Sequence, residues 1–455
     1  MAHNQWRAAT SPGSPAAVGR PRPTDRDVVL ERYHRHVNTS LASLARMIGA
    51  PVETRSAGTK VYGADGEVYL DCGGFGVFLL GHCHPRVVRA VRRQLEEHPL
   101  ATRVFLNPQL AEAAAALASV TPDGLDHVFL TNSGAEAVEL GLKLARLAGK
   151  TRIVAAEGGF HGKTLGALSV TGRLAYRDPF APLLPDVEFV PFGDITAMKE
   201  ALATDGERVA VILEPVQAEG GVRIPPSGYL SDVRTRCTAV GATLILDEIQ
   251  SGLGRLGAWW GAELAQISPD VLLVGKVLGG GVMPVGGVVA TTEIFAPLND
   301  DPMLHSSTFA GNPLASAAVT ATIDVLRDEG LIEASHRLGP VVLDMAREAV
   351  LRHCPGHVQE VRGQGLLVGI DFVSAEAATE FMLGLLERRV LPSYSLNSHH
   401  VLRLTPPAVL DSADLDWLAA ALTATARDLG HTSSLTSRST PIQPEEMPCV
   451  PSSST

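Results

Sequence analysis

The sequence predicts an α/β protein whose main sheet is largely parallel and covered by helices on both faces, together with a second, smaller domain. Short, nearly unbroken apolar runs alternate with helix-length amphipathic segments, which is the pattern of strands buried on both faces. The chain has 455 residues, of which 45% are hydrophobic. That is enough for two or three domains with a sizeable core.

The individual elements follow from the spacing of apolar residues. The expected strand DHVFLT at 126–131 precedes apolar residues at helical spacing, namely Ala137, Leu140, Leu144 and Leu147. From about Gly330, longer helical stretches surround strands near 366–372 and near 400–404, which predicts a small α+β domain. Further strands of the main sheet are expected at 152–156, 209–213, 243–246, 271–274 and 284–289.

The composition along the chain divides it into five expected parts. Both ends are rich in Pro, Ser or Arg and poor in apolar residues, so we expect them to be disordered. The parts are a tail at 1–27, a segment at 28–75 that joins the small domain, a large cofactor-binding domain at 76–330, the small domain at 331–430, and a tail at 431–455.

Charge and cysteine usage exclude several classes of function. The formal net charge is −11, so no basic field draws the chain to nucleic acid or anionic lipid. No apolar run approaches the roughly 18 residues of a membrane span. The five cysteines are scattered and odd in number, which fits a reducing cytoplasm rather than a disulfide framework. We therefore expect a cytoplasmic enzyme acting on small molecules, with no metal, nucleic acid or membrane partner.

Polar residues follow four of the expected strands where parallel strands present their carboxyl ends. A helix start at Ser133, Gly134 and Ala135 offers N–H groups and partial positive charge to a phosphate. Asp247 is placed to pair with a protonated ring nitrogen, and Lys276 to attack a carbonyl. Glu214 is a second carboxylate at the same edge. Phosphate, pyridinium and aldehyde together indicate pyridoxal phosphate.

Other interpretations of these and nearby residues remain open at this point. A single strand-end acid is more often a helix cap or an ion-pair partner, and a single lysine is usually on the surface. Gly252, Gly254 and Gly257 form the spacing GxGxxG, which would indicate a dinucleotide-dependent dehydrogenase if it opened directly from a strand. The loop 82–84, His-Cys-His, lacks further ligands at zinc spacing and is expected to be structural.

Several segments resemble the class III pyridoxal-phosphate aminotransferases of fold type I. Within the class they are most similar to the putrescine aminotransferases, and the resemblance covers about residues 28–428. It implies a large domain with a mainly parallel sheet of the seven-stranded type plus the smaller α+β domain. The segments are TNSGAEAVELGLKLAR (131–146), GGFHGKTLGALSVTG (158–172), ILEPVQAEGG (212–221), LILDEIQSGLGRLG (244–257), GKVLGGGVMPVGG (275–287) and HSSTFAGNPLA (305–315).

The resemblance also implies roles for individual residues. Lys276 would be the Schiff-base lysine, and Asp247 the partner of the pyridinium nitrogen. Thr308 would reach the phosphate of the neighbouring subunit, which implies a homodimer. Glu219 and Arg403 would pair until a substrate carboxylate arrives, which suggests 2-oxoglutarate or glutamate as one substrate. The other expected cofactor contacts are Ser133, Gly134, Ala135, Phe160, His161, Glu214 and Gln250.

The expected reaction is a ping-pong transamination, by a Schiff-base mechanism, between a primary ω-amine and a 2-oxo acid. A putrescine-like diamine or an ω-amino acid would be the donor. Ala135, Ala218 and Ala310 depart from residues that are usual in the family, so the identity of the amine stays open. The alternatives are glutamate-dependent amination of an aldehyde in a secondary-metabolite pathway, another pyridoxal-phosphate reaction such as an amino shift or epimerisation, and a dinucleotide-dependent dehydrogenase.

Overall fold

A computed structural model describes residues 25–102 and 104–436. By its internal contacts the chain divides into two compact units, one from Met1–Arg55 with Tyr62–Val68 and the other from Ser56–Val61 with Tyr69–Thr455. Most of the expected tails at 1–27 and 431–455 lies outside the described residues. At the inner ends of these expected tails, helix α1 begins at Arg26 and helix α15 continues to Thr436.

The first unit contains α1 (Arg26–Arg32), the π-helical turn η1 (Tyr33–Val37) and α2 (Thr39–Met47). Asp25 caps α1 by accepting from the N–H groups of Asp27 and Val28, and Asn38 caps α2 in the same way. Arg26 donates to the carbonyls of Ala45 and Ala50, so its side chain ties the two ends of this helical segment together. The strands that follow are β1 (Glu53–Ala57), β2 (Lys60–Gly63) and β3 (Val68–Asp71).

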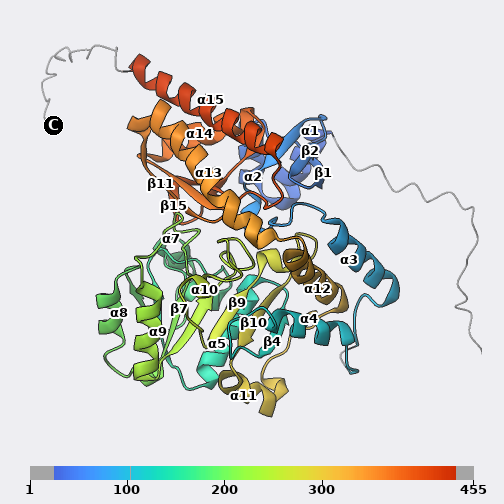
Figure 1. The fold of residues 1–455 in the computed structure, drawn as a ribbon, viewed down its shortest axis with the longest axis vertical. Helices are drawn as coiled ribbons and strands as arrows, with labels where there is room; N and C mark the ends of the chain where they lie inside the picture. Colours follow the sequence, from blue (N-terminus) through green and yellow to red (C-terminus); the bar gives the residue numbers. More distant parts are fainter. Residues whose placement is uncertain (1–24, 103, 437–455) are drawn as a thin grey trace, which may run out of the picture. The chain divides into compact units, whose positions relative to one another are not determined.

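The second unit contains the predicted seven-stranded sheet, with the order β4-β10-β9-β8-β7-β5-β6. Figure 1 shows β4, β10, β9 and β7 following one another along this sheet. All neighbouring strands are parallel except β10, which is antiparallel to both β4 and β9. The strands are β4 (His127–Thr131), β5 (Arg152–Ala156), β6 (Val187–Val190), β7 (Val209–Leu213), β8 (Thr243–Asp247), β9 (Val271–Val274) and β10 (Gly286–Ala290).

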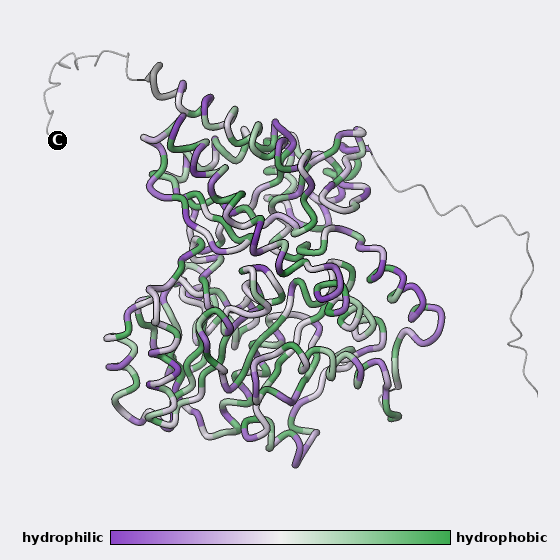
Figure 2. Tube along the Cα trace, viewed as in Figure 1, coloured by the Kyte–Doolittle hydropathy of each residue, from purple (hydrophilic) through white to green (hydrophobic). Residues whose placement is uncertain are grey.

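Both faces of this sheet are buried, as the apolar runs predict. Alternate strand residues point to opposite faces. One face packs with α5 (Gly134–Leu147) and includes Ile153, Ala210, Ile245 and Leu273. The other face packs with α4 (Pro108–Ala118), α8 (Ile195–Ala201) and α9 (Tyr229–Val240), and includes Val154, Val211, Leu244 and Leu272. Figure 2 shows the resulting pattern, in which the strands are mostly green and the outlying helix α3 (Pro85–Glu97) is mostly purple.

The chain beyond residue 330 forms the predicted smaller α+β arrangement. Its antiparallel sheet has the order β11-β12-β15-β14. Helices α13 (Leu331–His353) and α14 (Ala375–Glu387) pack with these strands, and α15 (Ser412–Thr436) packs with both helices. The strands are β11 (Val358–Gln364), β12 (Leu367–Phe372), β14 (Ser393–Ser395) and β15 (Ser398–Leu404), and the short β13 (Val390–Leu391) pairs with β3. The boundaries at 76, 330 and 430 stay a prediction.

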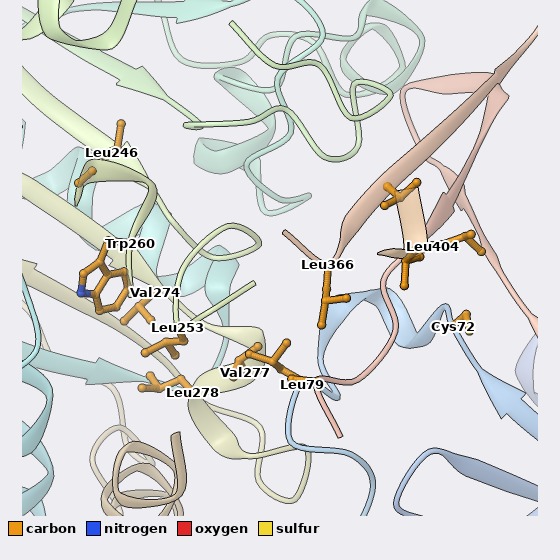
Figure 3. Close-up of a cluster of buried hydrophobic side chains, with 14 of the residues drawn as sticks. Cys72, Leu79, Leu246, Leu253, Trp260, Val274, Val277, Leu278, Leu366 and Leu404 are labelled. Atoms are coloured by element: carbon orange, nitrogen blue, oxygen red, sulfur yellow. The ribbon is translucent and has the colours of Figure 1, made fainter. Parts of the chain in front are cut away.

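An apolar cluster links the large sheet to the antiparallel sheet. Figure 3 shows Leu246, Val274 and Trp260 at one end of this cluster and Leu404 and Cys72 at the other, with Leu79 between them. All of these side chains are almost completely buried. Because close-packed interiors resist displacement, we expect the cluster to fix the ends of β8 and β9 relative to β15.

The remaining elements are short connections and covering helices. None of the described helices is long and apolar enough to cross a membrane. These elements are η2 (Gly74–Gly76), α6 (Leu165–Ser169), α7 (Leu174–Arg177), η3 (Asp178–Phe180), η4 (Gly206–Arg208), α10 (Gly261–Leu264), η5 (Lys276–Gly279), α11 (Thr292–Asp300), η6 (Pro302–Leu304), α12 (Pro313–Asp328) and η7 (Pro355–His357).

Candidate active site

Four of the predicted site segments meet at one edge of the large sheet. Strands β7, β8 and β9 are parallel and in register, so their carboxyl ends lie on the same side, where Glu214 follows β7, Asp247 ends β8 and Lys276 follows β9. Strand β4 is separated from β9 by the antiparallel β10 and therefore runs parallel to β9. The start of α5 at Gly134 lies at this edge too.

Asp247 and His161 form a buried pair at this edge. Nδ1 of His161 lies 2.7 Å from Oδ2 of Asp247, and both side chains are almost inaccessible to water. Oδ1 of Asp247 accepts the N–H of Ile249. Burial lowers the pKa of His161, but the hydrogen bond and the charge of Asp247 outweigh it and raise the pKa overall. The pair therefore favours a charged imidazole beside the Asp247 side chain.

Glu214 is buried next to this pair and has an unusual protonation preference. Its Oε2 accepts the N–H of Phe160 at 3.0 Å. Burial raises the pKa of Glu214 to about 8, although the positive charges of His161 and Lys276 act in the opposite direction. This carboxyl group binds a proton more readily than an exposed glutamate, and it orders the segment that carries Phe160 and His161.

Lys276 lies at the first position after the extended Gly275, in the connection between β9 and β10. Its φ of 43° lies in the left-handed region, which is uncommon for a residue with a side chain. Burial lowers the pKa of Lys276, while the carboxylates of Glu219 and Asp247 raise it. The side chain is partly buried. A lysine with a lowered pKa has more of the neutral amine that attacks carbonyl carbon.

Ile249 lies between the residue before this lysine and the start of α5. A methyl group built on Gly134 or Gly275 would lie 3.0 or 3.2 Å from the side chain of Ile249, so the three segments are in close contact. Both polar atoms of the Gln250 amide are buried without a hydrogen-bond partner in the described part of the chain. Buried amides normally have hydrogen-bond partners, so this amide is available to form hydrogen bonds with a polar ligand.

The start of α5 has the features of an anion site. The Oγ of Ser133 accepts the N–H of Glu136 at 3.2 Å, and the N–H groups of Gly134 and Ala135 fall outside the helical ladder. Gly162 approaches the Ala135 side chain so closely that an added Cβ would lie 2.9 Å from it. The segment that carries Phe160 and His161 therefore packs directly against this helix start.

The sequence did not predict the contact that joins the loop before α12 to the start of α5. Asn132 donates to Oγ of Ser307 at 2.9 Å and to the carboxylate of Glu136. Thr308, the next residue, is exposed, so the structure does not place it against Lys276 within this chain. The signal for Asn132 was its position directly before the helix cap Ser133.

Glu219 and Arg403 form the predicted ion pair. Oε1 of Glu219 lies 2.8 Å from Nη2 of Arg403, and the two side chains are almost completely buried. Arg403 also donates to the carbonyl of Tyr394. Nε and Nη1 of Arg403 are buried with no partner among the residues that the structure describes. The arginine thus holds unused donors beside the charged groups around Lys276.

Two other sequence patterns have structural explanations. Gly252, Gly254 and Gly257 lie in a long loop after β8, the next helix, α10, begins only at Gly261, and a Cβ on Gly252 would clash with Trp260. They therefore form no dinucleotide fingerprint. His82 bonds Asp71 at 2.8 Å and stacks on a phenylalanine. Nowhere in residues 25–102 and 104–436 do three potential metal ligands gather, His82 and its neighbours included.

Comparison with known proteins shows the family of the chain. The family model for aminotransferase class III matches residues 45–425. An ornithine aminotransferase structure from Toxoplasma gondii, described as having partial occupancy of PLP at its active site, aligns with 29% identity and a TM-score of 0.81 over 91% of this chain and 100% of its own. An (S)-enantioselective omega-transaminase from Thermomicrobium roseum gives 28% and 0.81 over 89% and 99%. The ornithine delta-aminotransferase of Plasmodium falciparum gives 28% and 0.74 over 86% and 98%.

Fold and site together define a pyridoxal-phosphate enzyme of fold type I. More specifically, the chain belongs to the class III aminotransferase family. Its cofactor is pyridoxal 5′-phosphate, and its substrates are an amine and an oxo acid. When bound, the cofactor supplies a ring that accepts electrons from the carbon bearing the amino group. The residues present fit it, since the unpaired Gln250 amide, the Asp247 carboxylate and the start of α5 offer what a phenolic oxygen, a ring nitrogen and a phosphate need.

Proposed function

We propose that this aminotransferase moves an amino group between a primary ω-amine, such as a putrescine-like diamine or an ω-amino acid, and a 2-oxo acid such as 2-oxoglutarate. The observation that carries the proposal is the buried pair of Glu219 and Arg403, 2.8 Å apart. Such a site must accept one substrate that has no carboxylate beside its amine, and a second substrate that does have a carboxylate there. An ion pair that can break and re-form meets both requirements.

The charges support this use of the pair. While Glu219 occupies Arg403, the two charges cancel, and the site suits an amine without an α-carboxylate. When a substrate carboxylate replaces Glu219 at Nη2 of Arg403, the unpartnered Nη1 or Nε supplies the second bond of a bidentate contact. The amine-bearing carbon of both substrates would then lie at the same place near Lys276.

We propose the following roles at the cofactor. Lys276 binds the cofactor covalently and then moves the proton from the donor carbon. Asp247, held by His161, keeps the ring nitrogen protonated, and Gln250 bonds the phenolic oxygen. Ser133, Gly134 and Ala135 hold the phosphate, Phe160 covers the ring, and Glu214 orders the Phe160 segment.

We also propose that the active unit is a homodimer in which Thr308 reaches the partner's phosphate. Thr308 is exposed, and so are the neighbouring Phe309 and the apolar segment 104–106. Leu106 is fully exposed, and Phe105 is 81% exposed. Exposed apolar groups of this size mark interaction surfaces. A groove of about 530 Å³ lies beside them and includes Leu110, Phe129 and Ala310.

A putrescine-like donor rests on the sequence resemblance, whereas the structural relatives act on ornithine or are omega-transaminases by their names. All of these donors carry an amine on a carbon without a carboxylate. The competing proposal is glutamate-dependent amination of an aldehyde, which the same Arg403 site would serve in the opposite direction. The four described cysteines form no disulfide, which supports a cytoplasmic setting.

A visible spectrum of the purified protein tests the proposal. Putrescine, cadaverine, ornithine, 4-aminobutyrate and glutamate are added separately, and the yellow absorption of the cofactor is followed. We expect loss of the yellow band with putrescine and its return with 2-oxoglutarate. If glutamate alone bleaches the band, the amine donor is glutamate and the aldehyde proposal replaces this one. If none of the five bleaches it, both are wrong.

A further inference from the structure

We infer that three side chains reaching the turn at 396–397 are positioning residues that hold Glu219 on Arg403, and that they thereby set the preference between substrates with and without an α-carboxylate. The inference rests on the proposed function of the Glu219–Arg403 pair. The three side chains are those of Arg173, Tyr176 and Asn397.

The turn between β14 and β15 holds Glu219 at two points. The N–H of Leu396 donates to Oε2 of Glu219 at 2.8 Å, and the N–H of Asn397 donates to the Glu219 carbonyl at 2.9 Å. Because Oε1 already contacts Arg403, both carboxylate oxygens have partners in this position. Glu219 therefore cannot leave the arginine without also giving up the N–H of Leu396, unless the turn moves with it.

The turn is anchored to the segment that follows the cofactor-binding loop. The hydroxyl of Tyr176 donates to the Leu396 carbonyl at 2.8 Å, and the guanidinium of Arg173 donates to the same oxygen. The Arg173 guanidinium also lies over the Tyr176 ring, 4.7 Å from its centroid, which orients both donors. These two side chains prevent Leu396 from following Glu219.

The side chain of Asn397 provides a second anchor. Its Nδ2 donates to the carbonyls of Gly158 at 2.8 Å and Gly159 at 3.0 Å. These glycines directly precede Phe160, whose N–H is bonded to Glu214. The turn is thus fixed to the cofactor-binding segment itself, and the N–H of Leu396 stays where it stabilises Glu219 on Arg403.

This arrangement makes the release of Arg403 more costly. A hydrogen bond from a fixed N–H to a carboxylate is stronger than one from a mobile N–H, because less ordering is needed to form it. A loosened turn lowers the cost of displacing Glu219. Substrates with an α-carboxylate, which must displace Glu219, gain from this change, whereas simple amines do not.

Calorimetric titration of the holoenzyme with glutarate, an unreactive dicarboxylate, tests the inference. Tyr176→Phe and Asn397→Ala each remove one anchor and leave Glu219 and Arg403 in place. We expect either variant to bind glutarate about 3- to 10-fold more tightly, the range of one neutral hydrogen bond such as those from Tyr176 and Asn397 to backbone carbonyls. The KM for 2-oxoglutarate should fall by the same factor, while kcat/KM for the amine stays within about twofold.

Two controls separate positioning from a general loosening. Thr379, on helix α14, accepts a hydrogen bond from the hydroxyl of Tyr394, which lies on strand β14. This bond does not involve the turn at 396–397, so Thr379→Val should change none of these values. In a Glu219→Gln background, Tyr176→Phe should no longer alter glutarate affinity, because no carboxylate competes for Arg403.

The outcomes distinguish the two proposals. A wild-type enzyme that binds no glutarate and does not react with glutamate overturns both the proposed use of Arg403 and this inference. A wild type that binds glutarate normally, with unchanged or weaker binding in both turn variants, overturns only the inference. The same holds if Thr379→Val has an equal effect, or if the gain persists in the Glu219→Gln background.

Discussion

Nδ1 of His161 lies 2.7 Å from Oδ2 of Asp247, and both side chains are almost inaccessible to water. His161 therefore fixes the orientation of the Asp247 carboxyl group, and the other oxygen of this group accepts the N–H of Ile249. A carboxyl group held in this way keeps its orientation while a ligand binds. In this protein the residue that orients the aspartate comes from a different loop from the aspartate itself.

Replacing this carboxylate by an amide should impair catalysis more than binding. We expect Asp247→Asn to slow the half-reaction with the amine by about 100-fold or more, because charge stabilisation in the transition state is lost. His161→Asn should cost less, roughly 10- to 100-fold, as is typical of a residue that orients another. Single-turnover rates at matched cofactor occupancy measure both. An Asp247→Asn enzyme within threefold of the wild-type rate would contradict the assignment.

Lys276 should be indispensable for turnover but not for folding. Lys276→Ala removes the only amine that we assign to covalent binding and proton transfer, so multiple turnover should fall to background. The circular dichroism spectrum and thermal midpoint should stay close to wild type, because the side chain forms no ion pair with another residue in the part of the chain that the structure describes. Lys276→Arg, which keeps the charge, should be equally inactive. Normal turnover in either variant would refute the role.

Arg403 should matter for one half-reaction only. We expect Arg403→Met to raise the KM for glutamate by roughly 100-fold and to leave the amine half-reaction within about threefold. The single change strands a buried Glu219 charge, which costs about 3–5 kcal/mol of stability. The double variant Glu219→Gln with Arg403→Met should recover most of this loss in thermal melts. Equal damage to both half-reactions would argue against a carboxylate site.

Glu248 gives a pH-dependent contribution to stability. It is buried, accepts from Ser251 and from the N–H of Ala262, and burial raises its pKa to about 7. A raised carboxyl pKa means that the folded state binds more protons, so the stability contribution is full below about pH 4.5 and is lost as the pH rises through about 7.

Glu248→Gln keeps the shape of the side chain but removes its ionisable carboxyl group. Relative to wild type, the variant should gain on the order of 3 kcal/mol of stability between pH 5 and pH 9. Thermal midpoints of both proteins across this range measure the difference. Parallel curves would show that Glu248 does not titrate in this window.

The proposed dimer predicts the effect of a charge on its surface. Phe105→Asp places a carboxylate in the exposed apolar segment 104–106 and should shift the protein toward monomers in sedimentation velocity. If Thr308 reaches the partner's phosphate, the monomers should also lose cofactor more readily on dialysis. Leu165→Asp, at another exposed apolar position, serves as the control. A dimer unaffected by Phe105→Asp would place the interface elsewhere.

The sequence predicted most of the sheet, but not all of it. The expected ranges for β5, β7 and β9 agree with the structure, because these central strands are continuous apolar runs. Strand β6 was missed because it lies at the sheet edge and carries Glu188 in its middle. The reversed direction of β10 has no signature in composition, since a strand buried on both faces reads the same in either orientation.

The candidate site divides in the same way. Lys276, Asp247 and Glu214 could be predicted because each follows a buried strand. The hydrogen bond between His161 and Asp247 joins positions 86 residues apart, and no local sequence pattern predicts it. The turn at 396–397 has no motif at all, because its contacts with Glu219 are made by backbone N–H groups. Such contacts depend on the path of the chain and not on residue identity.

The antiparallel β10 has a consequence for how the reactive lysine tolerates change. Lys276 lies in the connection at 275–285, which joins two hydrogen-bonded neighbours in the sheet and not a strand to a covering helix. A crossover loop can absorb an inserted residue by shifting its helix, but both ends of this connection are fixed by the β9–β10 register. We expect length changes here to displace the amine outright, so in evolution and in engineering this is the segment least able to vary.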